Sequence, residues 1–191
     1  IYPATFCPIR IIKKFDIYYN ITIYNIMKIF VLIFILISNV GFAASMGHIG
    51  EKGKASEVDR VIQIKMYDNY FEPNKINIKQ GETIKFLIQN LGTLVHEFNI
   101  ATKDMHFKHQ SEMLQMMENE ILLGDKIDYK KMDEMAKIDH VMAHSHSNSI
   151  LLEPKKSGEV IWKFNTKISL EAACNIPGHY ESGMVASINN Y

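Results

Sequence analysis

Apolar and polar residues alternate with a period of two along several short segments of this chain, and this alternation limits its fold more than any other feature. In residues 60–68, Ile62, Ile64 and Met66 fall on one side of an extended strand and polar residues fall on the other. The same pattern, or a short apolar run between turn residues, recurs in residues 74–90, 94–100, 148–164, 169–174 and 184–190. Short strands joined by turns that contain glycine predict an all-β sandwich.

One segment in the middle of the chain breaks this pattern. Residues 102–147 contain no proline and only one glycine, Gly124. Residues 104–122 and 128–142 have compositions that favour helices. We therefore predict a helical insertion at about residues 102–147, between two strands of the sandwich.

The N-terminal part of the chain carries a targeting pattern. Met27 and Lys28 precede an apolar run at residues 29–37, and small residues end the run at 41–43. This order is typical of a secretory signal peptide at residues 27–43. The run is short for a membrane span, which needs about 20 apolar residues. We expect a cleaved signal, a periplasmic location and no stable membrane span after cleavage; a retained membrane anchor is the alternative.

The segments on either side of this signal have simpler interpretations. Residues 1–26 are rich in Ile, Tyr, Asn, Lys and Phe, the composition that translated A+T-rich DNA produces. We expect them to be a non-native upstream extension, with translation starting at Met27; a genuine long leader is the alternative. Residues 44–58 include a Gly- and Lys-rich stretch, which predicts a flexible lead-in. The folded domain is then expected at residues 59–191.

Charge and cysteine content limit the possible functions of this chain. The formal net charge is +0, so no polybasic surface indicates a nucleic-acid partner. Beyond the expected signal peptide the chain keeps one cysteine, Cys174. Exported proteins usually use cysteines in disulfides, so a single exported thiol needs another explanation.

The stretch ACNIPGHYESGM at residues 173–184 offers that explanation. It places Cys174, His179 and Met184 at Cys-x4-His-x4-Met spacing, and His96 stands in another predicted strand. Two histidines, one cysteine and a weak axial methionine are the ligand set of blue copper electron-transfer sites. We predict one mononuclear type 1 copper per chain on these four residues. A structural cysteine with two unrelated histidines, or zinc in the same ligands, are the alternatives.

At these residues the chain resembles a known family, the cupredoxins, over most of residues 57–190. Residues 68–98 resemble the family's first half with its first histidine ligand, and CNIPGHYESGM resembles its ligand loop. The loop spacing is similar to that of rusticyanin and of periplasmic copper-tolerance cupredoxins. Glu97 stands after the first histidine, where plastocyanin-type members often carry Asn. The resemblance implies a Greek-key β-sandwich, one type 1 copper and no enzymatic activity.

The insertion raises the question of a second copper site. His140, Met142, His144 and His146 are close in sequence, and they form either such a site or the polar end of the insertion. His106 and His109 are a weaker candidate for such a second copper site. The remaining methionines either fill the core or capture Cu(I); they are Met113, Met116, Met117, Met132 and Met135.

Two functions follow from these features. The first is an electron carrier that exchanges electrons with a partner such as a cytochrome or a copper oxidase. The second is a periplasmic copper-tolerance protein, and the histidines and methionines of the insertion favour it. The alternative to both is a copper-sequestering or chaperone protein that uses the insertion as a second copper site without carrying electrons. We expect a monomer.

Overall fold

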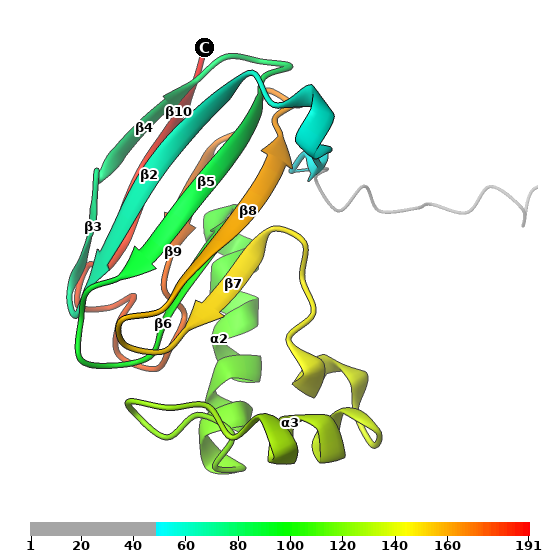
Figure 1. Ribbon diagram of the computed structural model, residues 1–191, viewed down its shortest axis with the longest axis vertical. Helices are drawn as coiled ribbons and strands as arrows, with labels where there is room; N and C mark the ends of the chain where they lie inside the picture. Colours follow the sequence, from blue (N-terminus) through cyan, green and yellow to red (C-terminus); the bar gives the residue numbers. More distant parts are fainter. Residues whose placement is uncertain (1–48) are drawn as a thin grey trace, which may run out of the picture. The chain divides into compact units, whose positions relative to one another are not determined.

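The computed structural model describes residues 49–191. Ten strands in this part of the chain form two five-stranded sheets that face each other (Figure 1). The first sheet has the order β1-β8-β5-β2-β3 and the second has the order β4-β10-β9-β6-β7. Their bounds are β1 Glu51–Lys52, β2 Arg60–Tyr67, β3 Tyr70–Glu72, β4 Lys75–Ile78, β5 Thr83–Asn90, β6 His96–Ala101, β7 Ser149–Leu152, β8 Ser157–Lys163, β9 Leu170–Ala173 and β10 Val185–Asn190.

Strand pairing within the two sheets gives a sandwich with crossed connections. Strand β2 pairs in parallel with β5, and β10 pairs in parallel with β4, while the other pairs are antiparallel. A parallel pair cannot be joined by a tight hairpin, so the chain crosses between the sheets. The predicted all-β sandwich with a helical insertion is confirmed.

The core between the sheets is built from the inward side of the alternating strands. Ile64 and Met66 of β2 are buried, as the alternation predicts. Phe98 lies at the centre of an aromatic group, with its ring edge-on to Phe71 and tilted against Phe86. Burial of such large apolar side chains is the main source of stability in a domain of this kind.

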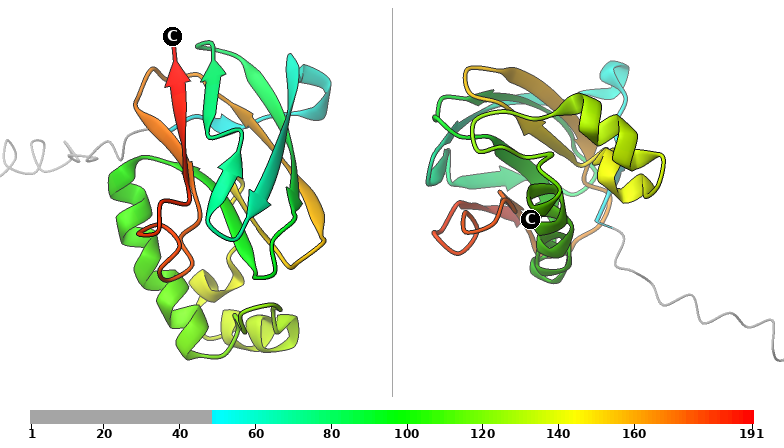
Figure 2. Two further views of the ribbon diagram at one scale, coloured as in Figure 1. Left: turned by 90° about the vertical axis from the view of Figure 1, so that its left-hand side faces the viewer. Right: turned by 90° about the horizontal axis from the view of Figure 1, so that it is seen from below.

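The insertion lies between β6 and β7. It contains α2 (Lys103–Glu118), α3 (Tyr129–Ala136) and the short 3₁₀ helix η2 (His140–Ala143). The Thr102 side chain accepts a hydrogen bond from the Met105 N–H and caps α2, and Asp128 caps α3 in the same way through the Lys131 N–H. Figures 1 and 2 show α3 beyond one end of the sandwich.

Both helices end earlier than the predicted ranges 104–122 and 128–142. Helix α2 ends at Glu118, and Glu120 adopts a left-handed φ of 54°. That turn sends Ile121 and Leu122 back into the core, where they are buried. The second predicted helix is divided because the Asp139 side chain accepts a hydrogen bond from the Val141 N–H and starts η2. Helix propensity is overridden by tertiary burial in the first case and by local capping in the second.

Most methionines of the insertion serve the core. Met113 and Met116 are completely buried, and Met142 is nearly so. Three others pack against the same core while partly exposed: Met105, Met132 and Met135. The usual role of a methionine stripe as core filler therefore holds for these residues.

The expected flexible lead-in is wrong for residues 49–57. Strand β1 pairs with β8, and residues Ala55–Glu57 form the 3₁₀ helix η1. The Trp162 Nε1–H donates to the Ile49 carbonyl at 3.2 Å, and the Gly53 N–H donates to the Ile161 carbonyl at 2.9 Å. The outer side of β8 offers unpaired backbone groups, and pairing with them orders a segment whose composition indicates flexibility.

The predicted upstream extension at residues 1–26, the predicted signal peptide at 27–43 and the start of the predicted lead-in at 44–48 lie outside the described residues. Among residues 49–191, none of the helices has the length and apolar character that crossing a bilayer requires.

Candidate metal centre

The first histidine of the predicted site is completely buried at the start of β6. The His96 Nε2 atom lies 3.1 Å from Asp68 Oδ1. Hydrogen bonds from the N–H groups of Thr93 and Leu94, together with the His96 ring, outweigh the burial of Asp68 and hold the pKa of its carboxyl below its usual value. Asp68 is therefore an acceptor, so His96 carries its proton on Nε2 and turns the free lone pair of Nδ1 toward the site.

The other predicted ligands belong to the loop between β9 and β10. The Cys174 N–H donates to the Met184 carbonyl at 3.2 Å, and the Met184 N–H donates to the His179 carbonyl at 3.0 Å. Gly178 and Gly183 have φ values of 87° and 95°, which glycine adopts without strain. These two left-handed positions fold the loop back on itself.

Three donor atoms converge between these elements. Cys174 Sγ lies 3.3 Å from His179 Nδ1 and 4.0 Å from His96 Nδ1. The two Nδ1 atoms are 3.2 Å apart. Ligands held about 2.0–2.3 Å from one metal ion at angles of 100–120° are separated by roughly 3.1–3.8 Å. Both contacts of His179 fall in this range and the Cys174–His96 separation slightly exceeds it, so the three side chains can converge on one metal ion.

Met184, the fourth predicted ligand, is completely buried in the same loop. Its backbone hydrogen bonds to Cys174 and His179 keep it next to the three converging residues.

Burial controls the protonation of the site. Burial lowers the pKa of His96 against the opposing effect of Asp68, and burial together with the charge of His96 lowers the pKa of His179. Both rings are thus neutral and able to bind a metal. Burial also raises the pKa of the Cys174 thiol to about 12. Without a metal the sulfur keeps its proton.

Two residues of the site have no ligand-like signal in the sequence. The Asp68 carboxylate accepts three further hydrogen bonds, from the Thr93 N–H at 2.7 Å, the Leu94 N–H at 3.3 Å and the Thr93 hydroxyl at 2.9 Å. Gly92 lies so close that a Cβ atom there would clash with the Asp68 carboxylate and would lie 2.7 Å from His96 Nε2. A single Asp after a strand and a single Gly in a turn are common, so only the folded chain identifies these two.

Glu97 connects the site to the insertion. Its backbone N–H donates to Cys174 Sγ at 3.3 Å. Its carboxylate oxygen Oε2 accepts hydrogen bonds from the backbone and side-chain amides of Asn175, at 3.2 Å and 2.7 Å. Glu97 therefore ties the strand of His96 to the residue that follows Cys174, and the Asn175 side chain helps to order the loop.

The ligand loop is also held by α2 and by Tyr180. His106 of α2 lies 3.2 Å from Asn175 Oδ1 through Nδ1, and 3.3 Å from the Glu171 carbonyl through Nε2. The Tyr180 hydroxyl donates to Glu171 Oε1 at 2.5 Å. Figure 2 shows α2 beside the orange-red loop after β9. The insertion thus braces the loop that carries three of the four predicted ligands.

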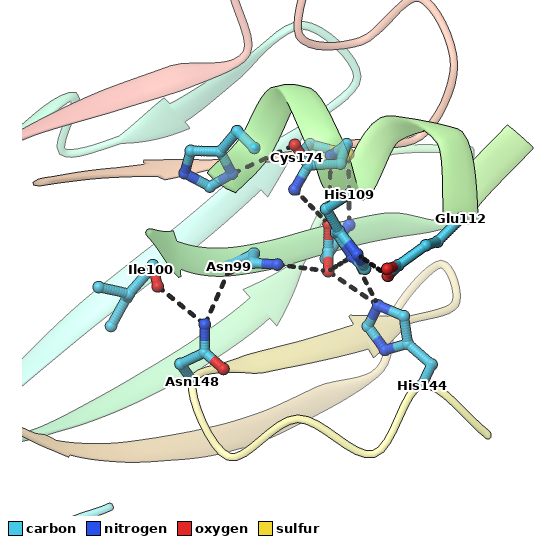
Figure 3. A network of polar contacts seen from close by, with 10 residues as sticks. Asn99, Ile100, His109, Glu112, His144, Asn148 and Cys174 are labelled. Carbon is cyan, nitrogen blue, oxygen red and sulfur yellow. Dashed lines mark hydrogen bonds and ion pairs between the residues drawn. The ribbon is translucent and has the colours of Figure 1, made fainter. Parts of the chain in front are cut away.

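A second polar cluster lies on the other side of Glu97. Its oxygen Oε1 is 3.0 Å from His109 Nε2 and 2.8 Å from His144 Nε2. Figure 3 shows His109 of α2, with Glu112 beside it, and His144 from the segment before β7, all gathered in this network. The fold thus brings His144 into contact with Glu97 and His109, although His144 is distant from both in sequence.

The predicted second-site group of His140, Met142, His144 and His146 does not come together in the form expected. His140 is exposed and Met142 is buried in the core. Both residues belong to the 3₁₀ helix η2 and differ in burial. Only His144 and His146 remain close, with ring centroids 5.2 Å apart.

Comparison with known proteins places this fold in one class. The family described as cupredoxin-like domain matches residues 30–123. Auracyanin B shares the fold with a TM-score of 0.53 at 12% sequence identity, covering 74% of this chain and 96% of that protein. Auracyanin from Roseiflexus castenholzii has a TM-score of 0.50 at 16% sequence identity, and the match covers 70% of this chain and 98% of that protein. The chain belongs to the cupredoxin family.

The relatives that are similar in sequence are copper-resistant cuproproteins. The copper-resistant cuproprotein CopI of Pseudomonas aeruginosa is 42% identical over 145 residues, which cover 73% of this chain and 80% of that protein. CopI of Rubrivivax gelatinosus is 30% identical over 140 residues, which cover 73% of this chain and 71% of that protein. This cupredoxin is therefore similar to copper-resistance proteins along most of its described length.

Proposed function

We propose that this protein is a periplasmic copper-tolerance cupredoxin with one type 1 copper held by His96, Cys174, His179 and Met184. The convergence of Cys174 Sγ with His96 Nδ1 and His179 Nδ1, at 3.2–4.0 Å from one another, carries this proposal. The similarity to copper-resistant cuproproteins supports the tolerance role, and the signal-peptide pattern at residues 27–43 supports the periplasmic location.

The donor set fits copper better than a hard metal ion. A thiolate and a thioether favour Cu(I), and imidazole nitrogens suit both oxidation states, so bound copper supplies a one-electron couple. Glu97 and Asp68 hold the donors in place before a metal arrives, through the Cys174 and His96 hydrogen bonds. A preformed site changes little between oxidation states, which favours electron transfer.

His179 is the ligand through which electrons would pass to a partner. His96 and Cys174 are completely buried, whereas His179 is half-buried. Its ring is therefore the part of the site nearest to solvent. A redox partner such as a cytochrome or a copper oxidase would dock over this edge, and the protein would act as a monomer without enzymatic activity of its own.

The test is optical and genetic. Loaded with Cu(II), the wild-type protein is expected to show an intense visible band from the copper–thiolate bond, and Cys174→Ala should remove it. Met184→Leu is the matched control: it should keep the band and change the reduction potential, since the axial ligand tunes that potential. A colourless oxidised wild-type protein would refute the type 1 assignment.

A second candidate, copper sequestration by the insertion, is favoured by the cluster at Glu97, His109 and His144. Expression in a copper-sensitive strain that lacks the protein separates the two functions. If tolerance depends on the type 1 copper, the wild type restores growth in copper and Cys174→Ala does not. If the insertion sequesters copper, Cys174→Ala still restores growth.

A further inference from the structure

We infer that Glu97, His109 and His144 form a second metal site, separate from the type 1 ligands, that binds a divalent transition-metal ion such as Cu(II). The three residues come from β6, α2 and the segment before β7, so the site would join the insertion to the sandwich. The two sites share no ligand.

The distances within this cluster fit a metal ion. Besides its two contacts with Glu97, His109 Nε2 lies 3.2 Å from His144 Nε2. Ligand atoms held about 2.0–2.1 Å from a metal at angles of 85–110° lie roughly 2.8–3.4 Å apart. Hydrogen bonding alone accounts for each ring's contact with the carboxylate. It does not account for two ring nitrogens so close together, because both must carry protons to donate to Glu97 and would then repel each other.

The orientation of His109 is that of a metal ligand. Its second ring nitrogen, Nδ1, lies 2.6 Å from Glu112 Oε2. Histidines that bind metals commonly donate this other N–H to a carboxylate, which directs the free nitrogen toward the ion. His96 and Asp68 show the same arrangement at the type 1 ligands. Figure 3 shows Glu112 beside His109.

The charge of the cluster favours a cation. The Glu97 side chain has no exposed surface, and its ion-pair partners among the described residues are the His109 and His144 rings. Buried charges need a counter-charge, and a divalent ion bound by the two rings would supply one.

His146 provides a route to the solvent. Its ring centroid lies 5.4 Å from that of His109 and 5.2 Å from that of His144, and the residue is exposed. It can deliver an ion from solution or complete the ligand set. His109, Glu112 and His146 also place one donor atom each within 4.8 Å of one another.

The donor types select the ion. Two imidazole nitrogens and one carboxylate oxygen contain no sulfur, so they favour divalent ions over Cu(I). Among first-row divalent ions Cu(II) binds such sites most tightly. The two sites would therefore differ in the oxidation state that they prefer.

Titration with Cu(II) tests the second site directly. The first equivalent should produce the visible band of the type 1 copper. The second should add a paramagnetic resonance signal with nitrogen coupling and no further visible band, to a total of two coppers per chain. A wild-type protein that retains only one copper through gel filtration overturns the second site. A missing visible band with the nitrogen-coupled signal present would instead contradict the proposed function alone.

Variants assign the signal to its ligands. His109→Gln with His144→Gln keeps donors for Glu97 while removing the imidazoles, so the second copper should be lost and the visible band kept. His140→Gln, an exposed histidine of the same insertion, is the matched control and should keep both. A second copper that survives the double change overturns the assignment.

Glu112→Gln provides a test that does not disturb the buried carboxylate. Glu112 is 36% exposed, so the fold should tolerate the change. Loss of a partner of this kind typically weakens metal binding by about 10–100-fold. The second copper should weaken to that extent while the visible band stays. Unchanged affinity for the second copper in Glu112→Gln would contradict the role given to His109.

Discussion

Removal of the Asp68 carboxylate is expected to weaken copper binding without removing any ligand. Asp68 accepts four hydrogen bonds: one from the His96 ring and three from residues 93–94. In Asp68→Ala the His96 ring loses the partner that fixes its proton on Nε2 and its orientation. Residues 93–94 lose the acceptor that holds the turn before β6.

The magnitude follows from these contacts. Net contributions of hydrogen bonds to charged groups are about 1.5–3 kcal/mol each, but the Asp68 side chain is 37% exposed, so water replaces part of what is lost. We expect the free energy of unfolding of the metal-free protein to fall by about 2–3 kcal/mol. Loss of a carboxylate that orients a ligating histidine should reduce copper affinity by about 10–100-fold.

Competition with a chromophoric copper chelator measures the affinity, and denaturant unfolding measures the stability. Asp68→Asn separates charge from hydrogen bonding, and its affinity should lie between those of the wild type and Asp68→Ala. Asp59→Ala is the matched control, because Asp59 also accepts a backbone N–H, that of Thr83 at 2.8 Å, but stands at the opposite end of β2. It should lose some stability and no copper affinity. Equal copper affinity in Asp68→Ala and Asp59→Ala would refute the reasoning.

Three further outcomes are expected. Gly92→Ala should lower copper affinity by about tenfold, because the added Cβ displaces Asp68 and His96. The far-ultraviolet circular dichroism should stay unchanged. Copper affinity equal to that of the wild type would contradict this prediction. Zn(II) bound at Glu97, His109 and His144 should raise the reduction potential of the type 1 copper, because a nearby buried cation disfavours Cu(II). Voltammetry measures this potential. It should show no such rise in the double variant His109→Gln, His144→Gln. Burial would raise the pKa of Glu82, but hydrogen bonds from Arg60 and the Lys79 N–H outweigh it and lower that pKa. The folded pKa thus lies below the unfolded one, so Glu82 stabilises the fold above the unfolded pKa and ceases to do so as the pH falls through the folded pKa. Glu82→Gln should therefore be less stable by about 1 kcal/mol at pH 7 and equally stable in strong acid, as measured by denaturant unfolding.

The ligand loop shows how much a local pattern can determine. Cys174, His179 and Met184 lie within eleven residues, and the turn glycines between them have the left-handed φ values that their positions suggest. Donor types and turn geometry are both local properties, so the loop is predictable without knowing the fold. The alternation along β2 is local in the same sense, because every second side chain of a strand faces the core.

Helix ends and the ordering of residues 49–57 were less predictable. Helix α2 ends where Ile121 and Leu122 turn into the core, and β1 is ordered by pairing with β8. In both cases the deciding contact joins segments far apart in sequence. Composition describes only the segment itself, so it indicated a longer helix and a flexible lead-in.

The surroundings of the metal centre depend on tertiary structure to the greatest extent. Asp68 meets His96 across 28 residues, and Glu97 meets His144 across 47. Neither partner carries a signal in its own segment, because a carboxylate becomes an orienting group or a ligand only when strand pairing and helix packing bring an imidazole to it. By itself the sequence determined a sandwich fold and predicted the chemical types of the copper ligands. Only the tertiary structure decided which carboxylates hold the histidines, because that choice is made by distances in space that no local pattern encodes.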